Sequence, residues 1–240
     1  MYEFGYYLYE NAHVEVGDAV IMYNNISTNT LWSYGIYTGP YESGYYVYDN
    51  AIVVFGNYTT SYNKVFSNQS DGIYFCSYEV GYNLDTNYYS SSMGYVTAGD
   101  VYLGHNTITA LNGYGLYLDY EEVGAYIYYD SWVQTGDIFL QDNTIDAYDG
   151  IYLDVEYLGY DLENNGKADL GTLDVSGNTV TANSTGGYGL SLYIYEVAYG
   201  LWDNSIFTVG DIFIHDNTVH DSYIGCLLYT SDAADEGLGV

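Results

Sequence analysis

Apolar and polar residues alternate with a period of two along much of the chain. The segment Ile151–Glu156 is a clear case, because Ile, Leu and Val occupy every second position and Tyr, Asp and Glu lie between them. Successive side chains of a β-strand point to opposite faces, so this pattern predicts strands with one buried face. β-branched and aromatic residues dominate such runs, and Gly, Asn and Asp separate them. The pattern therefore predicts an all-β protein.

One block recurs along the chain and predicts a repeat architecture. It consists of Gly-Asp, three alternating residues and, after a short gap, Asn-Thr followed by Ile or Val. The clearest copies are Gly99–Ile108, Gly136–Ile145 and Gly210–Val219. Weaker copies are Gly17–Ile26 and Gly171–Val180. Recurrence at this spacing is the sequence signature of a solenoid.

A second block follows the first and consists of Gly, an aliphatic residue, usually Tyr, and further alternation. Its glycines are Gly35, Gly72, Gly115, Gly150 and Gly189, at intervals of 37, 43, 35 and 39 residues. One such unit cannot bury its apolar side alone, but stacked units share a continuous core. Each unit is either one large coil or two short coils, and the sequence leaves both open.

These blocks resemble the right-handed parallel β-helix repeat family, which includes NosD-like proteins and carbohydrate-binding and sugar-hydrolase β-helix proteins. The resemblance covers residues 5–225 and rests on Asn-Thr-Ile followed by Gly-Ile-Tyr-Leu, as in residues 143–153. It extends to large, Tyr-rich β-helix surface proteins of archaea. It implies a right-handed parallel solenoid in an exported surface protein, with glycans as candidate ligands.

Equivalent residues of stacked coils are expected to form ladders. The inward apolar ladder would consist of Ile73, Leu116, Ile151 and Leu190. A ladder of hydrogen-bonded amides at a turn would consist of Asn106, Asn143, Asn178 and Asn217. An acidic ladder would consist of Asp18, Asp100, Asp137 and Asp211. Like charges about 4.8 Å apart repel unless salt or a cation screens them.

The charge balance excludes several classes of partner. The 240 residues include 32 acidic and 2 basic ones, for a formal net charge of −30. Such a surface repels nucleic acid and anionic membranes. No apolar run approaches the length of a membrane span. The hydrophobic share of 48% and the 36 tyrosines nevertheless predict a folded protein. The excess of acid also fits a halophilic protein of any role.

The two ends of the sequence differ from a complete solenoid. Met1 leads directly into Tyr-rich repeat sequence, without a basic and apolar leader. A sixth unit would begin at Gly225, but Cys226–Glu236 resembles the in-frame translation of a sequencing adaptor. We therefore expect residues 1–225 to be a solenoid fragment open at both ends. Residues 226–240 are expected to be a non-native or disordered tail that does not pack as another coil.

The segment Asp161–Thr172 resembles an EF-hand or dockerin-type calcium loop. Oxygen-bearing side chains stand at positions 1, 3, 5 and 9, with glycine at position 6. The ligands, with the lysine offering its backbone carbonyl, would be Asp161, Glu163, Asn165, Lys167 and Asp169. Thr172 replaces the bidentate acid, and the flanks read as strands. The alternative is an Asn-Gly turn between strands, so Ca²⁺ binding stays a hypothesis.

A row of outward tyrosines with nearby acids is the candidate glycan site. Its residues are Tyr37, Tyr74, Tyr117 and Tyr152, with Asp119, Asp154 and Glu156. Aromatic rings stack on sugar rings, and carboxylates accept hydrogen bonds from sugar hydroxyls. The alternative is cross-strand stacking that stiffens the sheet.

Catalysis has little support in the sequence. The resemblance implies that a β-helix lyase would use calcium and a basic residue, but the chain has no arginine and only Lys64 and Lys167. Carboxylates are so abundant that no hydrolase pair stands out. We therefore expect a non-enzymatic, extracellular, adhesin-like segment of a cell-surface protein that contacts neighbouring coils and glycans. The alternative is a carbohydrate-active hydrolase or lyase, which would need an irregular cleft with converging polar groups.

Overall fold

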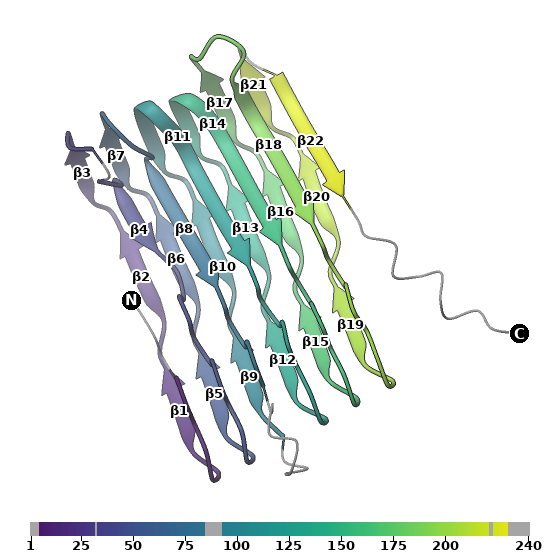
Figure 1. Ribbon diagram of the computed structural model, residues 1–240. Coiled ribbons are helices and arrows are strands. Elements are labelled where there is room, and N and C mark those ends of the chain that lie inside the picture. Colours follow the sequence, from purple (N-terminus) through teal and green to yellow (C-terminus); the bar gives the residue numbers. More distant parts are fainter. Residues whose placement is uncertain (1–4, 32, 85–92, 221–222, 230–240) are drawn as a thin grey trace, which may run out of the picture.

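The chain forms a parallel β-solenoid of about 5 turns of about 39 residues (Figure 1). The computed structural model describes residues 5–31, 33–84, 93–220 and 223–229. These residues form strands β1 to β22 and no helix, so no helix in the described part of the chain could span a membrane. The all-β fold and the solenoid predicted from the alternation and the repeat are confirmed.

Each turn contributes one strand to each of three faces, and all pairing between strands is parallel. The first sheet consists of β1 (His13–Val16), β5 (Ile52–Phe55), β9 (Tyr95–Ala98), β12 (Trp132–Thr135), β15 (Lys167–Leu170) and β19 (Ile206–Val209). The second sheet consists of β2 (Ala19–Met22), β6 (Tyr58–Ser61), β10 (Val101–Gly104), β13 (Ile138–Gln141), β16 (Leu173–Ser176) and β20 (Ile212–His215).

The third sheet carries the longest strands. It consists of β3 (Asn25–Thr28), β7 (Lys64–Ser67), β11 (Thr107–Glu121), β14 (Thr144–Glu156), β17 (Thr179–Ala182) and β21 (Thr218–His220). The second halves of β11 and β14 bend away and pair with a further set of strands. We call this set the fourth face, and it comprises β4 (Ile36–Thr38), β8 (Ile73–Tyr78), β11, β14, β18 (Tyr188–Tyr195) and β22 (Tyr223–Tyr229).

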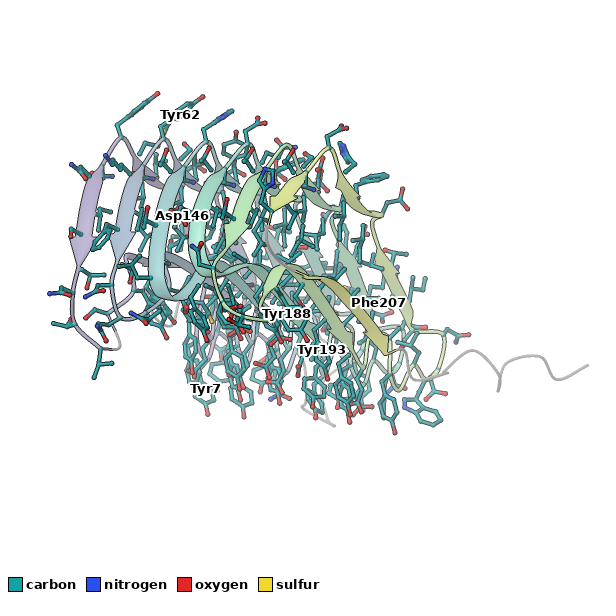
Figure 2. The ribbon with its side chains drawn as sticks, turned by 90° about the horizontal axis from the view of Figure 1, so that it is seen from above. Tyr7, Tyr62, Asp146, Tyr188, Tyr193 and Phe207 are labelled. Carbon is teal, nitrogen blue, oxygen red and sulfur yellow. The ribbon has the colours of Figure 1, made fainter. Side chains whose placement is uncertain are left out.

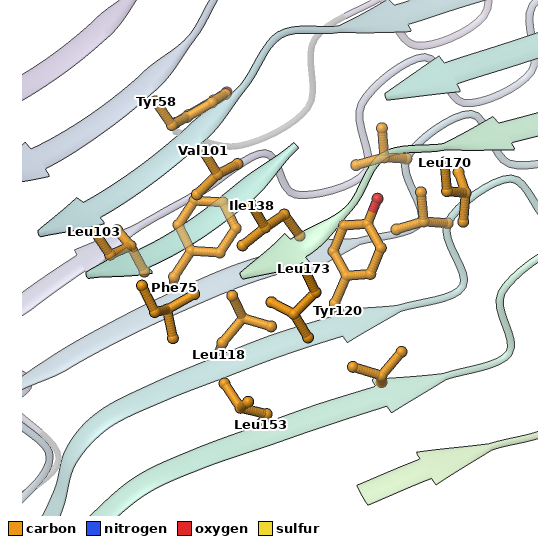
Figure 3. Packing of buried hydrophobic residues seen from close by; sticks show 14 of the residues in the cluster. Tyr58, Phe75, Val101, Leu103, Leu118, Tyr120, Ile138, Leu153, Leu170 and Leu173 are labelled. Atoms are coloured by element: carbon orange, nitrogen blue, oxygen red, sulfur yellow. The ribbon is translucent and has the colours of Figure 1, made fainter. Parts of the chain in front are cut away.

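The register shows that each repeat is one large coil. Leu116 pairs with Ile73 on one side and with Ile151 on the other, and Ile151 pairs with Leu190. These partners are one full repeat apart in sequence. All four side chains are buried in one continuous apolar core, part of which is seen in Figure 3. Burial of apolar area at about 25 cal/mol per Å² makes this core the main source of stability.

An asparagine ladder closes the turn between the second and third sheets. The Asn106 backbone N–H and Nδ2 donate to Oδ1 of Asn143 at 3.0 and 3.1 Å, and Nδ2 also donates to the Thr60 carbonyl. Asn143 bonds to Asn178 in the same way, and Asn178 bonds to Asn217. The ladder also includes Asn24 and Asn63. Burial costs these amides little, because every coil supplies the partner that the next one needs.

The acidic row is held by backbone donors. Oδ1 of Asp100 accepts the Asp137 N–H at 2.9 Å, and Oδ1 of Asp137 accepts the Thr172 N–H at 2.7 Å. Asn57 occupies the same position one coil earlier and accepts the Asp100 N–H. The predicted repulsion between carboxylates therefore acts in a row that Asn57 and Thr172 interrupt. In this row, the carboxylates of Asp100 and Asp137 each accept a backbone N–H from the next coil.

Strand β22 corrects the expected boundary of the solenoid. It pairs in parallel with β18, so Cys226 lies opposite Leu192 and Tyr229 opposite Tyr195. Backbone pairing thus extends four residues beyond the expected boundary at residue 225, while the expectation that residues 226–240 do not pack as another coil stays a prediction. Backbone pairing does not require the side chains of the repeat, and Cys-Leu-Leu-Tyr can adopt an extended conformation. Residues 230–240 lie outside the described residues.

Candidate functional site

The predicted tyrosine row lies on the fourth face as a chain of rings in contact. Tyr37, Tyr74, Tyr117 and Tyr152 occupy one register position on β4, β8, β11 and β14. Successive ring centroids are 5.2, 4.8 and 5.1 Å apart, with tilted or edge-on geometry. All four side chains are half-buried. The row therefore presents ring edges and partly covered faces to solvent.

Two of the three predicted acids, Asp119 and Asp154, are hydrogen-bond partners of this row. The Tyr74 hydroxyl donates to Oδ2 of Asp119 at 2.6 Å, and the Tyr117 hydroxyl donates to Oδ2 of Asp154 at 3.3 Å. Each bond joins one coil to the next. Phenols and carboxylates that could hold a sugar are thus engaged with each other, which supports the stiffening interpretation. The glycan interpretation of this row stays a prediction.

Burial and mutual repulsion change the electrostatics of the fourth face. Burial, followed by the charge of Asp154, raises the pKa of Glu156 to about 7. Burial, followed by the charge of Asp119, raises the pKa of Glu121 to about 7. Glu79 has a pKa of about 7 because of burial and the nearby Glu122. These glutamates therefore bind protons near neutral pH, which reduces the repulsion that a fully ionised face would carry.

Cys76 is buried beneath the tyrosine row. Its Sγ lies 3.8 Å from Oδ2 of Asp119. Burial and the charge of Asp119 raise the pKa of the thiol to about 12. The thiol is therefore protonated at neutral pH, the form in which cysteine is a poor nucleophile.

The segment that resembles a calcium loop forms a turn followed by a strand. Asn164 and Asn165 have φ values of 52° and 65°, and Gly166 leaves no room for a Cβ, which would lie 2.2 Å from the Ile127 carbonyl oxygen. Lys167 and Asp169 then point outward from the extended strand β15. Among the described residues, no group of three or more His, Cys, Asp or Glu is arranged to hold a metal ion. Calcium binding stays a prediction for this segment.

A groove on the outer face of the first sheet is the site that the sequence did not indicate. Its volume is about 660 Å³, and it crosses β9, β12, β15 and β19. Tyr95, Trp132, Lys167 and Ile206 line it from one register row. Asp169 and Thr208 line it from the next outward row, with Met93 and Asp130 nearby. It joins aromatic, cationic, acidic and hydroxyl groups in one place.

The groove exists because its row is irregular. The tyrosine row of the fourth face repeats one residue type over four coils, whereas Trp132, Lys167 and Ile206 differ in size and shape at successive coils. The buried Ala168 also lines the groove, so the hollow reaches the strand itself between Lys167 and Asp169. A comparison of outward positions one repeat apart would have brought Tyr95, Trp132 and Lys167 together. The sequence argument instead placed Lys167 in a calcium loop.

No protein-family model matches the chain, and no similar protein was found among curated proteins or among solved structures. Of the resemblance drawn from the repeat blocks, the structure supports the fold, a parallel β-solenoid of about 5 turns. Membership of a particular β-helix family stays a prediction.

Proposed function

We propose that the chain is a non-enzymatic structural segment of an extracellular surface protein, which serves display or adhesion. The observation that carries this proposal is a continuous row of six tyrosine rings, one per coil, in stacked, edge-on or tilted contact, which we call the tyrosine stack. Its members are Tyr6, Tyr45, Tyr82, Tyr126, Tyr160 and Tyr199, with successive ring centroids 5.0, 5.0, 5.0, 5.5 and 5.2 Å apart. Figure 2 shows rings crowded along this side of the solenoid, near the labelled Tyr7 and Tyr193.

Such a stack stiffens the solenoid along its axis. An aromatic pair contributes about 0.5–1.5 kcal/mol beyond its burial, and this stack places one pair at every interface between successive coils. The asparagine ladder adds hydrogen bonds at the same interfaces. A coil contacts only its neighbours, so a gain at every interface stabilises the whole stack. A stiff stack suits a structural segment that holds other parts of a surface protein in place.

The negative charge of the solenoid favours the same role. A net charge of −30 keeps copies apart and in solution. The same charge opposes binding of polyuronates, the anionic substrates of the lyases that share this kind of fold. Carboxylates such as those of Asp119 and Asp100 accept hydrogen bonds from a phenol or a backbone amide, and these bonds join neighbouring coils.

Two measurements test the proposal. Antibodies against the chain should label intact, unpermeabilised cells of the source organism. The chain should also release no reducing ends and no unsaturated products from polysaccharides. Labelling that requires permeabilised cells would contradict the structural display role.

The carbohydrate-active enzyme remains the second candidate because of the groove. Asp130 and Asp169 both line it, and glycoside hydrolases use a pair of carboxylates. A hydrolase would release reducing ends from a polysaccharide in an amount proportional to enzyme. The variants Asp130→Asn and Asp169→Asn would each abolish that release, whereas Asp142→Asn, in the exposed turn between β13 and β14, would leave it unchanged.

A further inference from the structure

We propose that the groove across β9, β12, β15 and β19 binds a neutral oligosaccharide that lies along the solenoid axis. The site is separate from the tyrosine row on the fourth face, and it does not depend on the display role. Its volume of about 660 Å³ lies within the range of about 300–1,000 Å³ that is typical of small-ligand sites.

The aromatic part of the groove fits the apolar faces of sugar rings. Trp132 and Tyr95 are direct partners on adjacent strands and are half-exposed. An indole or phenol ring packs against the C–H face of a pyranose while its edge stays in contact with water. Because the two side chains come from successive coils, they can contact successive sugar rings along one chain.

Lys167 supplies hydrogen-bond donors that no described carboxylate uses. It is one of only two basic residues among the 240, and it lies opposite Trp132 on the next strand. No carboxylate oxygen of the described residues lies within 4.0 Å of its ammonium nitrogen. The three donors of an ammonium group match sugar hydroxyls, which accept and donate in turn.

Two carboxylates and a hydroxyl provide the complementary acceptors. Oδ1 of Asp169 accepts a hydrogen bond from Thr208 Oγ1 at 2.6 Å, which orients the carboxylate on the outer face. Asp130 lines the groove from the loop just before β12. Sugar hydroxyls donate well to such oxygens. Aromatic rings, donors and oriented acceptors together form the set of contacts that a saccharide requires.

The charge of the groove selects a neutral sugar. Lys167 offsets one of the two nearby acids, so the groove retains a negative charge within a protein of net charge −30. This field repels uronates and sulfated sugars over about a Debye length. The three coil-to-coil steps from β9 to β19 span about 14 Å at about 4.8 Å each. That length accommodates a short linear oligosaccharide.

Tryptophan fluorescence can test this site directly, because the chain has three tryptophans. The double variant Trp32→Phe, Trp202→Phe leaves Trp132 as the only tryptophan. This variant is titrated separately with cellohexaose, xylohexaose, mannohexaose and maltohexaose, and binding to the unmodified chain is measured by calorimetry. We expect a saturable change in Trp132 emission with at least one of them.

Matched variants separate the groove from the rest of the surface. Trp132→Ala should weaken binding about tenfold, since one stacked ring is lost. Lys167→Met should weaken it by a smaller factor, because it removes donors and keeps the length of the side chain. Trp202→Ala removes an exposed tryptophan outside the groove and should leave affinity unchanged. Tyr95→Ala is the second groove variant, and circular dichroism checks the fold of each.

Three outcomes would overturn the assignment. The first is that none of the four sugars binds at about 10 mM, well above the Kd of about 1 mM that marks a weak specific site. The second is that Trp132→Ala and Tyr95→Ala both fold and bind as tightly as the unmodified chain. The third is that polygalacturonate binds and the neutral sugars do not. Saturable binding that both groove variants weaken and Trp202→Ala retains supports it.

Discussion

The Tyr74 hydroxyl donates a 2.6 Å hydrogen bond to Oδ2 of Asp119, which lies on the next coil two positions beyond the register partner of Tyr74. Tyr117 and Asp154 repeat this relationship one coil further. The bond is therefore diagonal, and it crosses the interface between coils on an outward face. A phenol can make it because the ring spans the distance to the neighbouring position of the adjacent strand.

The diagonal bond predicts a measurable stability effect. Tyr74→Phe keeps the ring and removes the donor, which leaves the half-buried Asp119 carboxylate without that partner. We expect a loss of about 1–2 kcal/mol in the free energy of unfolding, measured by denaturant titration. Tyr62→Phe is the control, since Tyr62 is 47% exposed on another face. Equal stability of the Tyr74 variant and the unmodified chain would contradict a structural role for the bond.

The asparagine ladder predicts a larger effect. Asn143→Ala removes the Oδ1 that accepts two hydrogen bonds from Asn106, and it removes the Nδ2 donor to the buried Leu103 carbonyl. We expect a loss of about 3–5 kcal/mol by the same titration, because several buried polar groups lose partners together. The exposed Asn25→Ala should cost little. A loss at Asn143 no greater than at Asn25 would show that water replaces the ladder.

The fourth face predicts that stability decreases as pH rises. Glu79, Glu121 and Glu156 have folded pKa values of about 7, against an ordinary value of 4.5. The folded state therefore binds more protons than the unfolded state between about pH 4.5 and 7, so the stabilisation present at low pH is lost as pH rises through 7. Melting temperature at constant ionic strength should be higher at pH 5 than at pH 8.

The triple variant Glu79→Gln, Glu121→Gln, Glu156→Gln tests whether these three groups cause the pH dependence of stability. It should flatten the pH profile of the melting temperature between pH 5 and 8, because the groups that gain protons on folding are gone. A melting temperature that rises with pH across this window in the unmodified chain would contradict the assignment of these glutamates as the dominant titrating groups.

The calcium hypothesis predicts an ion-specific effect. If residues 161–169 bind the cation, CaCl₂ should raise the melting temperature more than NaCl at equal ionic strength. Asp161→Asn, Glu163→Gln and Asp169→Asn combined should abolish the difference. A control that removes three charges elsewhere, Asp142→Asn with Asp211→Asn and Asp216→Asn, should retain it. Equal effects of the two salts on the unmodified chain would mean that salt only screens charge.

The exposed coil surface predicts association that salt promotes. Among the described strands, β20 pairs only with β16, and its Ile212 and Ile214 side chains are each 41% exposed. An open strand edge with apolar side chains pairs readily with another copy, and the charge of −30 opposes this. Light scattering of the 240-residue chain should show association that grows with NaCl. Ile214→Lys should reduce it, and a monomer at every salt concentration would contradict the prediction.

The sequence by itself determined the fold class and the main ladders. The alternation in Ile151–Glu156 specifies strands with one buried face, and glycines such as Gly115 and Gly150 recur at the length of one coil. The positions of Asn106 and Asn143 in their repeats were sufficient to predict an amide ladder, because stacking of like units brings equivalent residues together. Local pattern and repeat length are both properties of the chain alone.

The tertiary structure decided what the unlike residues of one row form together. Tyr95, Trp132 and Lys167 stand one repeat apart, at intervals of 37 and 35 residues, but they share no motif, and only the register of the first sheet shows that they line a groove. The diagonal contact of Tyr74 with Asp119 likewise depends on register and on the reach of a ring. The raised pKa of Glu156 depends on burial and on Asp154. These features arise from distances between coils, which a repeat pattern does not encode.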